Sequence, residues 1–194
     1  MSNSIYKRRV TKSIDVGGVK VGGDSPITVQ SMTKTDTRDV SATSRQISSL
    51  EEAGCEIVRC AVPDMEAAKA LRQIKKQANI PVVADIHFHY QLALESLESG
   101  VDCLRLNPGN IRDREKVELV VNKAKEREVP IRIGVNFGSL PPVGGIGKTR
   151  GQSRHNDGVD NLIKGGSQRE VYSAVDHMVA TGLWEIGILE NLDY

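Results

Sequence analysis

The sequence is short of several features that define other classes of protein. It has three cysteines in 194 residues, and because none forms a C-x-x-C pair, neither a disulfide framework nor an iron–sulfur ligand set is expected. No run approaches the ~20 apolar residues of a membrane helix, and the basic N-terminus lacks the apolar segment of a secretory signal. The net charge of +1 gives no general attraction to nucleic acid or membranes. We therefore expect a cytoplasmic globular protein with neither kind of partner.

What the sequence does contain is a repeated alternation of short β-branched runs and helical segments. The runs cover 27–31, 56–60, 81–85, 102–106 and 130–135, and the helices 41–53, from 63–64 onward, 89–98, 113–127 and from Gln168 onward. This alternation predicts right-handed βαβ units and a parallel sheet. No G-x-G-x-x-G follows the first run, which weighs against a dinucleotide-binding fold.

The chain divides into an N-terminal extension and one larger domain. Residues 14–21 predict a β-hairpin with a Gly17-Gly18 turn, a candidate plug for the floor of a barrel, so 1–24 is assigned to the extension. The domain at 25–194 contains about five βα units, whereas a TIM-type barrel has eight in ~250 residues. The predicted fold class is α/β, an incomplete TIM-type (β/α) barrel preceded by a hairpin, with one unpaired sheet edge.

Polar side chains stand at the carboxyl ends of the predicted strands, where barrel enzymes place their active sites. The candidates are Arg59, Asp85, His87, Arg105, Asn107, Arg132 and Asn136. Side chains alternate along a strand with period two, so each pair on one strand shares a face, and Gly134 leaves room for a ligand or a neighbouring side chain. Three converging arginines predict a site for a phosphate or diphosphate ester, because guanidinium groups bind phosphate oxygens in pairs.

Other interpretations of these residues stay open. Each arginine could belong to an ion network with Asp85 and Asp102, although these acids are too few for all three. His87 could be structural, and with His89 it gives only weak evidence of metal binding, so no metal ligand is assigned. The cysteines are expected to pack as small apolar residues. The Gly-rich segment 140–167 does not meet the phosphate-loop pattern and is interpreted as a lid or irregular insertion.

Five motifs in order resemble the family of 4-hydroxy-3-methylbut-2-en-1-yl diphosphate synthase. They are VQSMT at 29–33, GCEIVRCAVP at 54–63, VADIHF at 83–88, LRLNPGN at 104–110 and RIGVNFGSL at 132–140. The resemblance implies reductive dehydration and ring opening of 2-C-methyl-D-erythritol 2,4-cyclodiphosphate in non-mevalonate isoprenoid synthesis. It assigns diphosphate binding to Arg59, Arg105 and Arg132, with Asp85, His87, Asn107 and Asn136 completing the polar lining. No catalytic residue is assigned.

The resemblance also implies parts that this sequence does not contain. In the family, a [4Fe–4S] cluster is held in a C-terminal domain by C-x-x-C, a later cysteine and a glutamate. The family takes electrons from ferredoxin or flavodoxin and forms a homodimer. The cluster domain is expected to be absent from 1–194, so the chain alone is expected to be inactive. Two alternatives are a pterin-binding synthase or methyltransferase barrel and a non-catalytic barrel remnant that binds phosphate.

Overall fold

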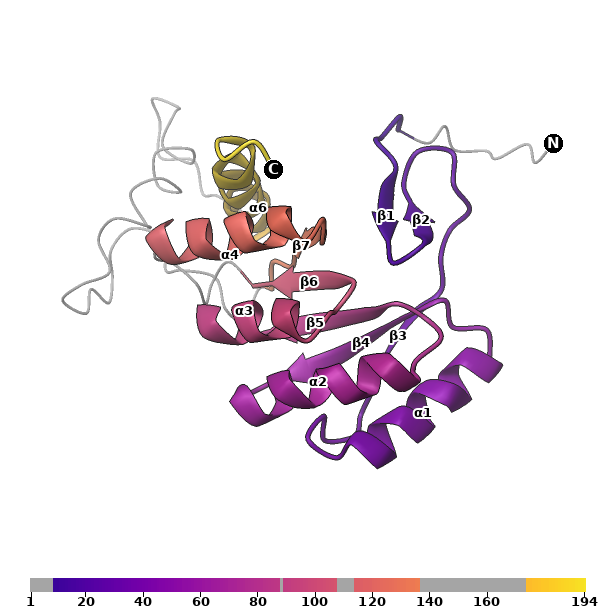
Figure 1. Ribbon diagram of the computed structural model, residues 1–194. Coiled ribbons are helices and arrows are strands. Elements are labelled where there is room, and N and C mark those ends of the chain that lie inside the picture. Colours follow the sequence, from indigo (N-terminus) through magenta and orange to yellow (C-terminus); the bar gives the residue numbers. More distant parts are fainter. Residues whose placement is uncertain (1–8, 88, 108–113, 137–173) are drawn as a thin grey trace, which may run out of the picture.

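The computed structural model describes residues 9–87, 89–107, 114–136 and 174–194, which form a hairpin, a parallel sheet and five helices (Figure 1). The hairpin strands pair antiparallel, and the five sheet strands lie side by side in chain order. The hairpin consists of β1 (Ile14–Val16) and β2 (Val19–Val21), and the sheet of β3 (Gln30–Met32), β4 (Ile57–Val62), β5 (Val82–Ile86), β6 (Cys103–Leu106) and β7 (Ile131–Ile133).

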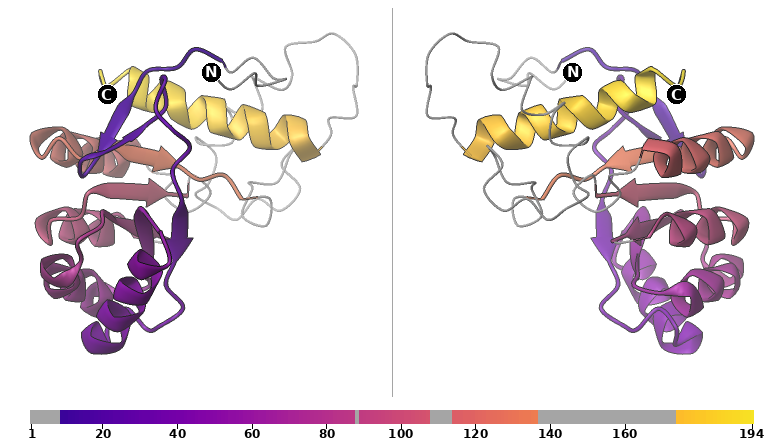
Figure 2. Two further views of the ribbon diagram at one scale, coloured as in Figure 1. Left: turned by 90° about the vertical axis from the view of Figure 1, so that its right-hand side faces the viewer. Right: turned by 90° about the vertical axis from the view of Figure 1, so that its left-hand side faces the viewer.

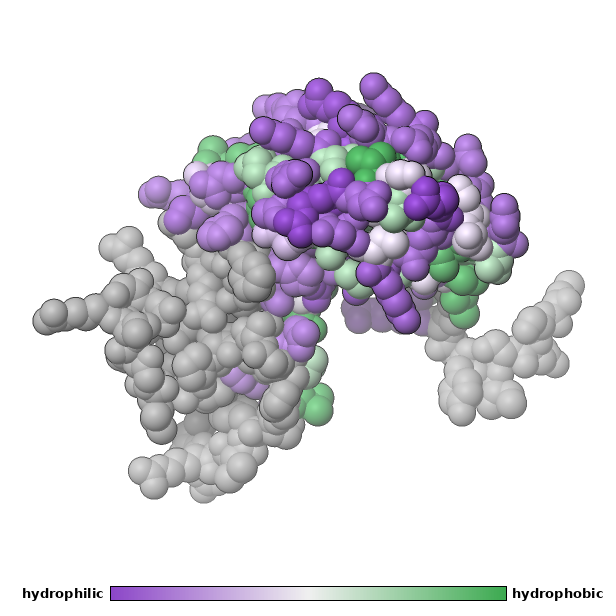
Figure 3. Space-filling view, turned by 90° about the horizontal axis from the view of Figure 1, so that it is seen from below, coloured by the Kyte–Doolittle hydropathy of each residue, from purple (hydrophilic) through white to green (hydrophobic). Residues whose placement is uncertain are grey.

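Helices follow the strands and cover one face of the sheet. They are α1 (Val40–Glu52), α2 (Met65–Gln77), α3 (Tyr90–Glu98), α4 (Arg114–Glu126) and α6 (Ala174–Glu190). Figure 2 shows α1 to α4 along one side of the sheet and α6 at its β7 end. Seen from the side of α1 and α2, the surface is mostly hydrophilic with scattered apolar side chains (Figure 3). Among the described residues, no helix has the length and apolar character needed to cross a bilayer.

The main core lies between the sheet and α1 to α4. Alternate residues of the central strands point into it and are fully buried, among them Val58, Cys60, Val82, Ala84 and Leu104. The helices contribute apolar residues at helical spacing, including Ile47, Leu71, Ile74, Val117, Val120 and Ala124. Each fully buried aliphatic side chain contributes about 1.5–3 kcal/mol by leaving water. Because side chains alternate along a strand, the residues between these core positions point to the opposite face of the sheet.

Aspartates in the connections that follow β3 and β4 are the N-caps of the next helices. Asp39 accepts a hydrogen bond from the backbone N–H of Ala42 at 2.9 Å, and Asp64 accepts one from Ala67 at 2.9 Å. Each carboxylate satisfies a donor that the first turn of the helix leaves unpaired. Asp64 thus begins the helix that the sequence predicts from 63–64 onward.

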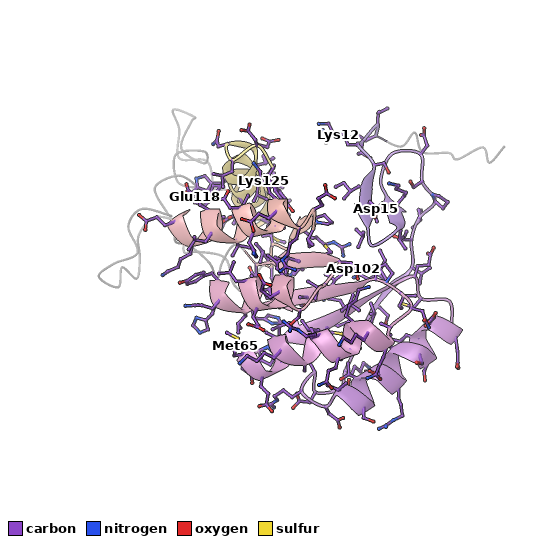
Figure 4. All side chains as sticks on the ribbon, viewed as in Figure 1. Lys12, Asp15, Met65, Asp102, Glu118 and Lys125 are labelled. Atoms are coloured by element: carbon purple, nitrogen blue, oxygen red, sulfur yellow. The ribbon has the colours of Figure 1, made fainter. Side chains whose placement is uncertain are left out.

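The hairpin packs against the amino-terminal end of the sheet, the position at which a barrel floor is predicted. Its turn residues Gly17 and Gly18 have φ of 57° and 95°, the two positive angles of a type I′ turn. A Cβ on Gly17 would lie 2.6 Å from Asp102 Oδ1, so the turn also needs glycine for its close approach to β6. Figure 4 shows Asp15 in the hairpin on the same side of the molecule as Asp102.

A second apolar cluster lies where the hairpin meets the sheet. Val16 of the hairpin packs against Ile57, Val83 and Cys103, the first residues of β4 to β6 that face away from the helices. These side chains fill the amino-terminal half of the interior face. The carboxyl-terminal half of that face is therefore where polar residues can gather.

The strand and helix predictions agree with the structure except at some ends. The first strand begins at Gln30 rather than at Ile27, which is 83% exposed, and its register with β4 starts at the pair Gln30 and Ile57. The last strand is shorter than 130–135. The first helix ends at Glu52, and Ala53, the last residue of the predicted range 41–53, is its exposed C-cap. The segment 140–167 lies outside the described residues.

Candidate anion site on the interior face of the sheet

The sheet register brings the predicted charged residues together. Asp85 and Arg105 are Cα partners across β5 and β6, and Arg105 and Arg132 are partners across β6 and β7. Arg59 of β4 is the partner of Val83, which belongs to the interior apolar cluster. Because neighbouring residues in register point to the same face, all four side chains lie on the face opposite the helices.

Asp85 is the centre of this cluster. Its side chain is 2% exposed, and its Oδ1 accepts a hydrogen bond from Arg105 Nη1 at 2.9 Å. Its Oδ2 lies 3.1 Å from Arg59 Nε and 3.9 Å from His87 Nε2. The Arg59 contact is an ion pair without hydrogen-bond alignment, since the buried Nε makes no hydrogen bond among the described residues. Two of the three arginines therefore belong to a network with Asp85, as the alternative interpretation anticipated.

Arg105 is held against the backbone of the next strand. Its Nη2 donates to the carbonyl oxygen of Gly134 at 2.9 Å, and its side chain is 13% exposed. A Cβ on Gly134 would lie 1.9 Å from Arg105 Nε, so no larger residue fits without moving the guanidinium. The space that the sequence predicted beside Gly134 is occupied by Arg105.

Arg132 contacts a neutral group in place of a carboxylate. Its Nη1 donates to Oε1 of Gln30, which lies on β3 at the opposite edge of the sheet. Met32 of the same strand lies with its sulfur 3.2 Å from Arg59 Nη2. Gln30 and Met32 belong to the motif at 29–33, but no role was predicted for them from the sequence. The signal that could have found them is their alternation: both face the interior.

The predicted histidine and asparagines lie at the carboxyl ends of the strands. His87 follows β5 with its side chain 33% exposed. Asn107 follows β6 and is buried, whereas Asn136 lies three residues beyond the end of β7 and is exposed. His87 lies close to Asp85. The structure places the two asparagines at the same edge of the sheet.

The cluster carries more positive than negative charge. Among the residues that the structure describes, three arginines face one aspartate, which leaves +2 before His87 is considered. The other acid considered as a partner, Asp102, instead pairs with Lys75 Nζ at 2.8 Å and accepts from the backbone N–H of Val82 at 2.7 Å. Asp102 therefore does not neutralise the arginines. An excess of guanidinium groups on a partly enclosed face is suited to an anion with several acceptor oxygens.

The three cysteines do not fit an iron–sulfur cluster. Cys60 points into the helix-side core, Cys103 lies on the opposite face beside the hairpin, and all three are buried. Burial raises the pKa of the Cys60 thiol and of the Cys103 thiol to about 11, whereas a ligand sulfur must be deprotonated. Within the described residues no group of three or more potential ligands could hold a metal ion.

The fold and site together define a parallel (β/α)-barrel domain with a cluster of arginines on its interior face. A family model for the GcpE TIM-barrel domain matches residues 11–194. The chain belongs to this family, and the incomplete barrel predicted from the sequence is confirmed as a TIM-barrel-type fold whose five-stranded sheet is not closed.

Curated relatives named 4-hydroxy-3-methylbut-2-en-1-yl diphosphate synthase (flavodoxin) match the chain. The protein of Dehalococcoides mccartyi is 64% identical over 134 residues, covering 69% of this chain and 38% of that protein. The Symbiobacterium thermophilum protein is 51% identical and covers 98% of this chain and 45% of its own length. The Geobacter sulfurreducens protein is 53% identical, with 95% and 46% covered. The chain thus spans less than half the length of these relatives.

Proposed function

We propose that this chain is the substrate-binding barrel portion of a 4-hydroxy-3-methylbut-2-enyl diphosphate synthase. The whole enzyme would convert 2-C-methyl-D-erythritol 2,4-cyclodiphosphate, two electrons and two protons into 4-hydroxy-3-methylbut-2-enyl diphosphate and water. The observation that carries the proposal is the excess of three arginines over one aspartate on the interior face. The names of the relatives support the same reaction and favour it over the pterin alternative.

The proposed task of the arginines is to bind the diphosphate and hold its ring in one orientation. A cyclic diphosphate carries several anionic oxygens, and guanidinium groups donate to them in fixed directions. Arg59, Arg105 and Arg132 come from three different strands, so they can approach the ligand from different sides. His87, Asn107 and Asn136 would donate to or accept from the remaining polar groups at the same edge.

Asp85 is proposed to position the site rather than to bind phosphate. A carboxylate repels an anionic ligand, but this one is buried, and its two oxygens contact Arg105 and Arg59. It would fix the two guanidinium groups before the substrate arrives. Preorganised donors lose little further freedom on binding, which strengthens the complex.

The organisation of the whole protein is also part of the proposal. Residues 1–24 would form the hairpin extension and 25–194 the substrate-binding portion of the barrel. A [4Fe–4S] cluster held by residues outside this chain would supply electrons received from flavodoxin, as the relatives' names support, or from ferredoxin. The intact protein would be a cytoplasmic homodimer. The chain by itself would bind the substrate without reducing it, since its cysteines do not converge.

Calorimetry with the cyclic diphosphate tests the proposal. The parent protein should bind it, and Arg105→Ala and Arg132→Ala should each lower the affinity about 10- to 100-fold, the equivalent of one charge-assisted contact. Arg45→Ala is the matched control, because it removes the same charge from an exposed position on α1. Circular dichroism should establish that each variant is folded. Parent-like affinity in both site variants would show that the arginines do not bind the ligand.

A further inference from the structure

Gln30 and Arg132 connect the two edge strands of the sheet through their side chains. Gln30 lies on β3 and Arg132 on β7, with three strands between them. Their hydrogen bond, from Arg132 Nη1 to Gln30 Oε1, therefore crosses the interior instead of joining adjacent strands. Gln30 is the Cα partner of Ile57, whose side chain belongs to the interior apolar cluster. The curl of the sheet brings an amide from the first strand to the arginine of the last.

We propose that Gln30 is a positioning residue, which holds Arg132 in its ligand-binding orientation without cancelling its charge. The inference rests on the proposed function, since it concerns the same anion site. A carboxamide oxygen accepts from a guanidinium as a carboxylate does, but it carries no formal charge. Arg132 therefore gains a fixed direction and keeps its full attraction for an anion.

The contrast with Asp85 explains why a neutral partner matters here. Asp85 contacts both Arg59 and Arg105 and offsets one of their two charges. A second carboxylate opposite Arg132 would lower the excess of the cluster from +2 to +1. It would also compete with ligand oxygens for the same N–H donors. The identity of residue 30 therefore sets how strongly the site attracts a doubly anionic ligand.

Substitution of Gln30 by glutamate separates orientation from charge. Gln30→Glu keeps an acceptor oxygen against Arg132, so stability in chemical denaturation should be unchanged or higher. Its affinity for inorganic diphosphate in calorimetry should nevertheless fall about tenfold or more, because the added charge repels the anion across a short distance. Gln30→Ala loses the orientation but not the charge, and its affinity should fall less. Gln73→Glu, an exposed site on α2, introduces the same charge far from the cluster and should bind like the parent.

The contact itself is tested without ligand by a double-mutant cycle. Gln30→Ala and Arg132→Ala should be coupled, so that the double variant is less destabilised than the sum of the two single variants. Parent-like diphosphate binding by Gln30→Glu, or strictly additive stabilities, would overturn the inference while leaving the proposed function intact. Failure of the parent protein to bind either diphosphate or the cyclic substrate would overturn both.

Discussion

Replacement of Gly134 by alanine should dislodge the most enclosed arginine of the site. The added Cβ would lie 1.9 Å from Nε, 2.5 Å from Cζ and 2.6 Å from Nη2 of Arg105. These distances are far below van der Waals contact, so the guanidinium must move. The backbone itself tolerates alanine, because Gly134 is not among the glycines with positive φ. The substitution therefore acts on the side chain of Arg105.

The expected cost follows from the two bonds that Arg105 would lose. Its Nη1 bond to Asp85 and its Nη2 bond to the Gly134 carbonyl both measure 2.9 Å, and hydrogen bonds to charged groups contribute about 1.5–3 kcal/mol each. Asp85 keeps its contact with Arg59, which limits the penalty of leaving a buried carboxylate underpaired. We expect the free energy of unfolding to fall by about 2–4 kcal/mol, and diphosphate affinity to fall about 10- to 100-fold.

Urea denaturation and calorimetry measure the two effects, and α6 offers a matched control. An added Cβ at Gly187 meets nothing within 4 Å, so Gly187→Ala should stabilise its helix by up to about 1 kcal/mol. In an Arg105→Ala background the obstructing side chain is gone, and Gly134→Ala should cost little. A Gly134→Ala protein with the stability and affinity of the parent would refute the reasoning. If Gly134→Ala lowers the free energy of unfolding equally in the Arg105→Ala background, the destabilisation comes from some other contact.

Further measurements test the loops and the core. Hydrogen bonds from the side chain of Arg38 lower the pKa of Asp36 to about 2, so the stabilisation from this pair should be complete above about pH 4 and lost as the pH falls toward 2. In Arg38→Gln the pKa of Asp36, measured by carboxyl-carbon NMR titration, should return toward its ordinary value of 3.8, and a value still near 2 would exclude Arg38 as the cause. Because burial raises the pKa of Cys60 and Cys103 to about 11, a thiol reagent at pH 8 should label them only when urea unfolds the protein. Rapid labelling of the native protein would contradict the packing described for both.

Local patterns predicted most of the fold because strands, caps and turns are set by near neighbours. Asp64 caps its helix and Gly17-Gly18 form the hairpin turn, and both follow from short-range chemistry. The start of β3 was missed because strand pairing depends on where the partner strand begins. Ile27 looks like a strand residue, yet the register between β3 and β4 starts at the pair Gln30 and Ile57.

The site was predicted in composition but not in connectivity. Positions at the strand ends predicted that Arg59, Arg105 and Arg132 converge, and the register brings them to one face together with Asp85. Alternation gives no information on which arginine takes the carboxylate, because that depends on side-chain rotamers. The contact between Gln30 and Arg132 was beyond reach for a different reason: it depends on the curvature of the whole sheet. The binding role of these residues remains a prediction.

The central claim is that the interior arginines bind a cyclic diphosphate, and a crystal structure of the protein with this compound tests it most directly. We predict phosphate oxygens about 2.7–3.2 Å from guanidinium nitrogens of Arg59, Arg105 and Arg132. Asp85 should remain in contact with Arg59 and Arg105. Ligand bound elsewhere on the chain, with no phosphate contact to any of the three arginines, would contradict the account.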